Sequence, residues 1–143
     1  MRFIALSTLL AAGCLLLGGC SSGPAMSEVE GVLTVAGKPL DKIQIEFWPE
    51  VDGPRSYGVT DNKGHYSLMS DDGKRAGAVV GAHRVVLRDI GIWGDKVLGR
   101  DAENVDLAKG KKPRISGEYG DSLKTPVRKT VTAGAKNTIN IEL

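Results

Sequence analysis

The sequence predicts an all-β fold, a β-sandwich of about seven short strands, and three observations support this expectation. The length of 143 residues suits one domain, with little room for a second core. Several segments alternate between apolar and polar residues, as strands do when one face lies on a core. Turn-forming residues separate these segments at short intervals, which is typical of two packed sheets.

The first segment differs from the rest in composition and predicts an export signal. Arg2 is its only charged residue, and Ile4–Leu17 is apolar or small apart from Ser7 and Thr8. As a helix rising ~1.5 Å per residue, this run is too short to cross a hydrocarbon core of ~30 Å. A basic start, a short apolar stretch and small residues are typical of a signal peptide.

The apolar run ends at a cysteine that we expect to be lipidated. Residues 17–20, Leu-Gly-Gly-Cys, resemble the bacterial lipobox, in which lipid is attached to the cysteine and cleavage occurs just before it. The alternative is an ordinary signal peptide followed by a chance cysteine. Cys14 would be discarded with the signal, so acylated Cys20 would leave no thiol for a disulfide or a metal.

These features divide the chain into three parts. We expect a signal peptide over residues 1–19, the lipidated cysteine and a polar tether over residues 20–27, and the β-sandwich over residues 28–143. Several acyl chains anchor a protein stably. Because Ser21 rather than Asp follows the cysteine, the expected location is the outer membrane.

Two strands are predicted at the start of the domain. Val29–Val35 is rich in β-forming residues and ends at the turn signal Gly37-Lys38-Pro39. Lys42–Trp48 alternates and is expected to be half-buried. Its apolar face carries Ile43, Ile45 and Phe47, and its polar face carries Lys42, Gln44, Glu46 and Trp48.

The next segment predicts a hairpin. Arg55–Thr60 is a short third strand, and Asp61–Gly64 supplies Asp to open a turn and Gly for a positive φ. Tyr66 and Leu68 then alternate with polar neighbours, as expected of the returning strand.

The remaining strands lie on both sides of an irregular stretch. Ala82–Leu87 predicts a strand with Val85 and Leu87 inward, and a hairpin is expected from Val127–Thr132 and Thr138–Leu143 through Ala133-Gly134-Ala135. Between Ile90 and Pro126 the alternation stops. Asp101–Lys109 could form a short helix, since Asp101 suits its cap and Gly110 follows its end.

Several motifs together resemble the carboxypeptidase regulatory-like (transthyretin-like) β-sandwich domains. They are Val29–Val35 with Gly37-Lys38-Pro39-Leu40, the hairpin Thr60–Leu68, the strand Gly81–Val85, and the stretches Tyr119–Val131 and Asn137–Leu143. The last two are similar to short lipoproteins of this kind that are common in Planctomycetes. The resemblance implies a seven-stranded transthyretin-like or Ig-like sandwich that is usually a non-catalytic structural or binding module.

Catalytic motifs are missing from the sequence, so we expect no enzyme and no cofactor. There is no Gly-x-Ser-x-Gly elbow, no Ser-x-x-Lys, no His-Glu-x-x-His and no phosphate-binding glycine loop. The enzymatic alternative is hydroxyisourate hydrolase, a transthyretin-like enzyme that ends in Tyr-Arg-Gly-Ser, whereas this chain ends in Ile-Asn-Ile-Glu-Leu. A formal net charge of +2 argues against a general polyanion binder, and the export signal argues against nucleic acid.

Few residues are candidates for metal ligands, and we expect no metal site. His65 is predicted to face solvent beside the hairpin turn, and His83 to lie at the edge of the core. Asp61 fits a turn better than a calcium loop, because the further acidic ligands of an EF-hand are absent.

The candidates for partner contact are aromatic and basic side chains. They are Trp48 and Trp93, the basic run Lys109, Lys111, Lys112 and Arg114, and Tyr119. Aromatic residues and cations together suit a polar or anionic partner. The sequence therefore predicts a monomeric, non-enzymatic envelope lipoprotein that serves as a structural or protein-interaction module. The alternative is a module that binds carbohydrate or a small ligand.

Overall fold

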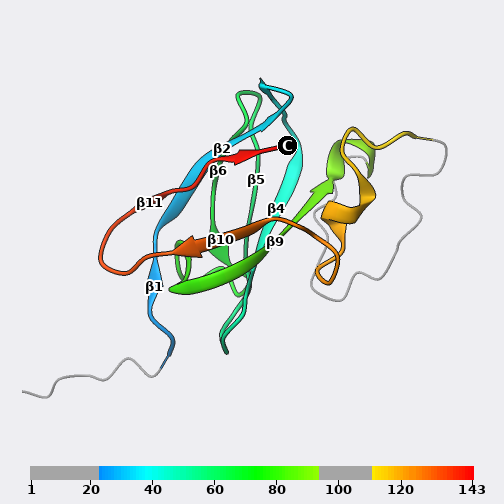
Figure 1. Ribbon diagram of the computed structural model, residues 1–143. Helices are drawn as coiled ribbons and strands as arrows, with labels where there is room; N and C mark the ends of the chain where they lie inside the picture. Colours follow the sequence, from blue (N-terminus) through cyan, green and yellow to red (C-terminus); the bar gives the residue numbers. More distant parts are fainter. Residues whose placement is uncertain (1–22, 94–110) are drawn as a thin grey trace, which may run out of the picture.

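The computed structural model describes residues 23–93 and 111–143, which form a mostly β domain with its sheets in a sandwich-like arrangement (Figure 1). Within these ranges the helices are two short 3-10 turns, η1 (Ile90–Trp93) and η2 (Gly117–Gly120). None of the helices in the described ranges is long and apolar enough to cross a membrane. The expected signal peptide, Cys20 and the expected helix over residues 101–109 lie outside the described residues.

The described residues contain twelve strands in place of the seven expected, because several long segments are interrupted at one residue. Glu28 separates the first two strands, and Leu68 separates the sixth from the seventh. In chain order the strands are β1 (Met26–Ser27), β2 (Val29–Val35), β3 (Lys38–Pro39), β4 (Ile43–Pro49), β5 (Ser56–Val59), β6 (His65–Ser67), β7 (Met69–Ser70), β8 (Ala78–Val79), β9 (Gly81–Asp89), β10 (Arg128–Val131), β11 (Asn137–Thr138) and β12 (Ile141–Glu142).

One sheet is built around β2, the predicted first strand. Antiparallel β3 and β6 pair with one edge of β2, and β11 and β12 pair with its other edge in parallel. At Gly31 the chain passes very close to the link between β11 and β12, since a Cβ there would lie 1.8 Å from the carbonyl oxygen of Ile139. The same oxygen accepts a hydrogen bond from the Tyr66 hydroxyl at 2.6 Å, between β11 and β12.

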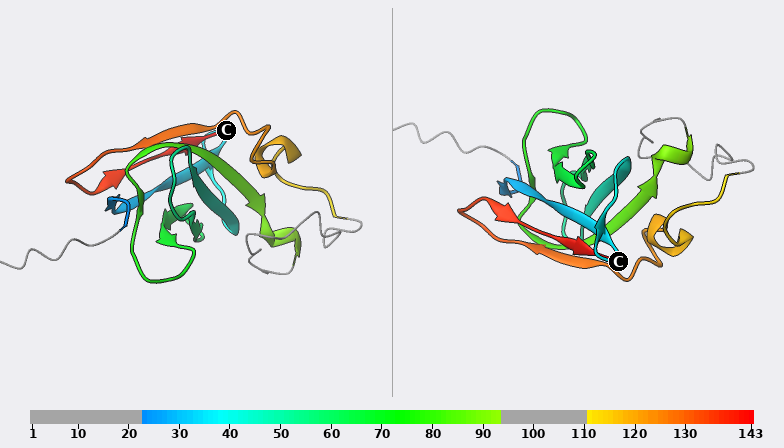
Figure 2. Two further views of the ribbon diagram at one scale, coloured as in Figure 1. Left: turned by 90° about the horizontal axis from the view of Figure 1, so that it is seen from below. Right: turned by 90° about the horizontal axis from the view of Figure 1, so that it is seen from above.

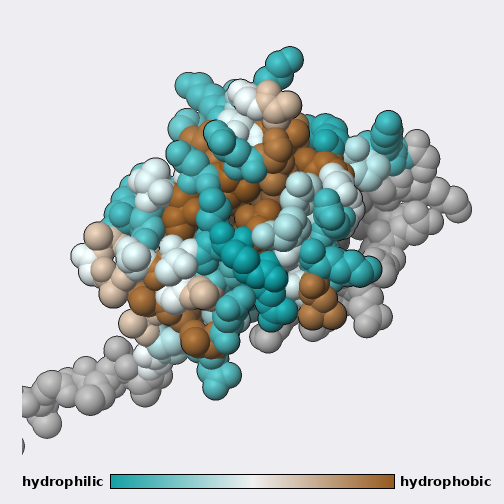
Figure 3. All heavy atoms as spheres, viewed as in Figure 1, coloured by the Kyte–Doolittle hydropathy of each residue, from teal (hydrophilic) through white to brown (hydrophobic). Residues whose placement is uncertain are grey.

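The other sheet is antiparallel throughout, in the order β10-β9-β4-β5-β7. The two sheets pack against each other (Figure 2), and buried residues of both form the core. On the face seen in Figure 3, apolar residues gather between β2 and β10, where the two sheets approach each other. Buried hydrophobic residues of the core include Leu33, Tyr66 and Ile141 from the β2 sheet and Ile43, Ile45, Phe47, Val85 and Leu87 from the five-stranded sheet.

The first predicted hairpin is present in part, because β5 pairs antiparallel with β7 across the turn at Asp61–Gly64. The second predicted hairpin, from Val127–Thr132 to Thr138–Leu143, is wrong in its pairing. The Asp61 carboxylate accepts hydrogen bonds from the amides of Lys63 (2.8 Å) and His65 (2.9 Å), as a turn-forming Asp does. The returning segment is shared between the sheets: β6 pairs with β2, and β7, which follows after Leu68, pairs with β5. In the second predicted hairpin the two arms do not pair with each other, because β10 pairs with β9, whereas β11 and β12 pair with β2. Alternation sets which face of a strand is apolar, but not which edge it pairs with.

The described fold also starts before the predicted boundary at residue 28. β1 lies in the stretch expected to be a tether, and it pairs with β8 in a two-stranded sheet. Pro24 is held as well, because its carbonyl accepts a hydrogen bond from the guanidinium of Arg75 at 3.2 Å. The polar and Gly/Pro composition of this stretch predicted a linker. The stretch is held instead by backbone hydrogen bonds between β1 and β8, which do not require apolar side chains.

Candidate functional site

The face of the five-stranded sheet that points away from the core, here called the outer face, carries arginine and aromatic side chains. Trp48 on β4 is opposite Arg84 on β9, which is opposite Arg128 on β10, so the three form one row across the sheet. In the next row Glu46 is opposite Tyr57 on β5. Neighbouring strands lie ~4.8 Å apart, so side chains of adjacent strands are within reach of each other.

Glu46 is the centre of this face and is fully buried, with 0% of its surface exposed. Its carboxylate accepts four hydrogen bonds from side chains on the same face. The donors are Nε2 of Gln44 (2.8 Å), Nε1 of Trp48 (2.9 Å), Nη1 of Arg55 (2.9 Å) and Nε of Arg88 (3.0 Å). A buried charge is tolerated when it is paired and hydrogen-bonded in this way.

The burial of Gln44 and Glu46 corrects the expectation that Lys42–Trp48 is half-buried. Both side chains alternate away from the core, yet neither is exposed to solvent. The reason is that Arg55 and Arg88 reach over the face and bond to the carboxylate, which removes it from water.

The same network fixes the indole of Trp48. Its ring nitrogen is bonded to Glu46, and the guanidinium carbon of Arg55 lies 5.5 Å from the ring centroid, a cation–π distance. Arg55 is itself buried, and its Nε has no hydrogen-bond partner. With two guanidinium groups and one carboxylate, the network carries an excess of positive charge.

Arg84 and Arg128 extend this positive charge across β9 and β10. Arg84 is half-buried, and its Nη1 donates to the Ser122 carbonyl at 3.3 Å. Among the described residues, no carboxylate forms an ion pair with Arg84. Arg128 has 49% of its side chain exposed and lies 3.6 Å from the Glu50 carboxylate. Like charges directly opposite on neighbouring strands are destabilising, so this row would be stabilised by an anion.

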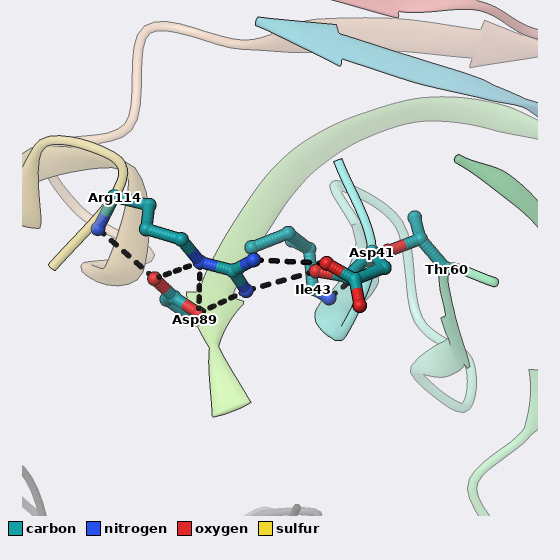
Figure 4. A network of polar contacts seen from close by, with 5 residues as sticks. All are labelled: Asp41, Ile43, Thr60, Asp89 and Arg114. Atoms are coloured by element: carbon teal, nitrogen blue, oxygen red, sulfur yellow. Dashed lines mark hydrogen bonds and ion pairs between the residues drawn. The ribbon is translucent and has the colours of Figure 1, made fainter. Parts of the chain in front are cut away.

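A second polar network, the Arg114 clamp, joins the segment before η2 to the five-stranded sheet (Figure 4). The Arg114 guanidinium bonds to the carboxylate of Asp89 at 2.6 Å and to that of Asp41 at 2.9 Å. Burial by itself would raise the pKa of Asp89, but hydrogen bonds from the side chain and backbone of Arg114 outweigh it and hold this pKa below its usual value. The clamp therefore holds the partly exposed Arg114 against the five-stranded sheet.

A cavity of about 1120 Å³ opens beside the clamp, at the end of β9. Its lining is mixed: Leu87, Ile92 and Ile115 are apolar, and Asp89, Glu118 and Lys124 are charged. Residues of η2 line the cavity, and in both views of Figure 2 the two 3-10 helices lie at the end of the domain opposite to β1.

The two histidines lie apart in different sheets. His65 on β6 is exposed, as predicted. His83 on β9 is fully buried rather than at the edge of the core. Its Nε2 lies 2.7 Å from the Val79 carbonyl oxygen, and its ring centroid lies 5.4 Å from that of Phe47. Burial lowers the pKa of His83, which favours the neutral ring. Residues 23–93 and 111–143 contain no cluster of three or more His, Cys, Asp or Glu side chains that could hold a metal.

The residues predicted for partner contact occupy different places. Trp48 lies on the outer face, Arg114 is held by two aspartates, and half-buried Tyr119 packs against the core. Lys111 and Lys112 are exposed. Lys109 and the side chain of Trp93 lie outside the described residues, although Trp93 ends η1. No hydrogen bond, ion pair or ring contact links Trp48 to the other described candidates.

Sequence reasoning missed the arginines of the outer face: Arg55, Arg84, Arg88 and Arg128. A signal for two of them was present, because Arg84 and Arg88 alternate with the inward Val85 and Leu87. Their partners come from other strands, so the pattern of one strand could not show the network.

Comparison with known protein families, with curated proteins and with solved structures found no match for this chain.

Proposed function

We propose that this chain is an exported lipoprotein of the cell envelope, anchored through Cys20, and that its β domain is a non-enzymatic interaction module. The composition of the outer face supports the proposal of an interaction module. Trp, Tyr and Arg are the side chains that most often dominate binding energy at interfaces. Trp48 and Arg88 are already held by Glu46, so binding would cost little further side-chain entropy.

The position of β1 supports a domain held close to a membrane surface. Met26 lies six positions after Cys20, which allows a span of at most about 20 Å. The cavity beside η2 lies at the end opposite to β1, so it would point away from the membrane (Figure 1). We also propose that the domain has a transthyretin-like sandwich fold and that the lipid anchor lies in the outer membrane.

A carbohydrate- or small-ligand-binding module is the second candidate function. The fixed, half-buried indole of Trp48 favours it, because an aromatic ring on a rigid sheet can stack on a sugar.

The anchor is tested by comparing Cys20→Ser with Cys14→Ser in cells that express the full chain. We expect the wild type and Cys14→Ser in the membrane fraction, with a mature N-terminus at Cys20 that carries the mass of attached acyl chains. Cys20→Ser should lose both the added mass and the membrane association. Unchanged membrane binding of Cys20→Ser would contradict the lipoprotein proposal.

The interaction module is tested by placing a photo-crosslinking amino acid at single positions in intact cells. Tyr57 on the outer face is the test position, and exposed Thr138 on the β2 sheet is the control. The proposal expects adducts from position 57 and few from position 138. Equal labelling at both positions, or none at 57, would contradict it.

A further inference from the structure

We propose that the outer face binds an anionic polysaccharide, with Arg84 and Arg128 contacting its acidic groups and Trp48 contacting its sugar rings. This inference rests on the proposed interaction module and names the chemistry of its ligand. It concerns the row Trp48–Arg84–Arg128 and the Glu46 network beside it.

Charge is the first argument. The outer face gathers four guanidinium groups, those of Arg55, Arg84, Arg88 and Arg128, and the carboxylates bonded to them are those of Glu46 and Glu50. The chain as a whole is nearly balanced, but a ligand meets the local field of the surface that it approaches. The outer face is therefore positive although the whole chain is not strongly basic.

Arg84 supplies the second argument. It is half-buried, its described polar contact is a carbonyl at 3.3 Å, and the side chain opposite it is another arginine. Partial burial of the Arg84 guanidinium costs free energy, and so does its position opposite the like charge of Arg128. A carboxylate or sulfate between Arg84 and Arg128 would offset both costs, because a guanidinium binds such groups through two parallel hydrogen bonds.

The arrangement of the face favours a sugar polymer over an acidic protein. Protein interfaces usually have an apolar centre and a polar rim. Here the centre is the charged Glu46 network, and the half-buried aromatics Trp48 and Tyr57 lie among the arginines. A polysaccharide that carries acidic groups presents both chemistries along its length, with ring faces for the indole and anions for the guanidinium groups.

The test measures binding of the full-length protein, purified in detergent, to immobilised polymers by biolayer interferometry. Polygalacturonate and heparin are the anionic polysaccharides, dextran is the neutral one, and poly-L-glutamate represents an acidic protein. We expect binding to at least one anionic polysaccharide, weaker binding at high salt, and none to dextran. Arg84→Ala with Arg128→Ala should weaken this binding by about tenfold or more.

Lys63→Ala is the matched control, because it removes one exposed positive charge from the Asp61–Gly64 turn, away from the outer face. It should bind as the wild type does, and circular dichroism should show the same β spectrum for every variant. Equal binding to dextran, tighter binding to poly-L-glutamate, or no effect of the arginine changes would overturn the inference. These results would leave the Cys20 and photo-crosslinking tests unaffected, so failure of the ligand and failure of the module are distinguishable.

Discussion

From Ile43 to Phe47 both faces of β4 are fully buried, but by different physics. Ile43, Ile45 and Phe47 on the inner face and Gln44 and Glu46 on the outer face all have 0% of their surface exposed. The inner face is buried by packing, which is non-directional and scales with apolar area. The outer face is buried by hydrogen bonds and ion pairs, each of which needs a particular partner at a particular distance.

This difference predicts different responses to substitution. A packed apolar face tolerates changes of shape that keep its volume, whereas a buried ionic network is sensitive to the loss of a single charge. The loss of stability should therefore depend on whether a substitution removes core packing, a buried charge or an exposed ion pair.

Phe47→Ala should cause the largest loss, about 4 kcal/mol in the free energy of unfolding. The side chain is fully buried in the core, with its ring centroid 5.4 Å from that of His83, so its removal leaves a cavity. Chemical denaturation checks the value, and Phe47→Leu should cost much less because most of the volume remains. A loss below about 1 kcal/mol for Phe47→Ala would show that the inner face is not tightly packed.

Glu46→Gln should cost about 3 kcal/mol, because Arg55 and Arg88 lose their counter-charge while the side-chain shape is kept. Exposed Glu142→Gln on β12 is the matched control and should leave the denaturation midpoint unchanged. Trp48 fluorescence should also change, since the indole loses its charged acceptor. If both glutamates behave alike, the outer face is not held by its ionic network.

Arg114→Ala should cost about 1–2 kcal/mol at neutral pH, less than Glu46→Gln, because part of the guanidinium is exposed. The pKa of Asp89 is lowered in the folded protein, so the unfolded chain binds its proton first as the pH falls. This contribution is complete above the unfolded pKa of about 3.9 and is lost as the pH falls through the lower folded pKa. Denaturation between pH 7 and pH 2 should therefore show a shallower acid loss for Asp89→Asn than for the wild type.

Arg128→Ala should have the smallest effect on stability, within about 0.5 kcal/mol, because its pair with Glu50 is long and exposed. Thermal denaturation checks this value. A large loss of stability would mean that Arg128 supports the fold, and its effect on polysaccharide binding would then need to be measured at matched stability.

The inner face could be predicted from the sequence because alternation is a local property. The range of β2 was correct, and the inward positions of Ile43, Ile45 and Phe47 followed from the same pattern. The outer network could not be predicted, because Glu46 and Arg88 are 42 residues apart and meet only through the register of β4 and β9. The pairing of β10 with β9, and of β11 and β12 with β2, could not be predicted for the same reason. The turn at Asp61 and the return of the chain beside β5 were visible locally, but the pairing of β6 with β2 was not, because β2 is distant in the sequence.

The parallel pairing of β11 and β12 with β2 has a consequence for the order in which the domain can fold. The Val32 amide donates a hydrogen bond to the side chain of Asn140, 108 residues away, so the partner of β2 on that edge is made after all the other described strands. Until then this edge of β2 exposes unpaired backbone groups, which other chains can join. Contacts between distant residues also slow folding. A chaperone that covers β2 while the rest of the chain is made would protect the protein at the stage when it is most prone to aggregate.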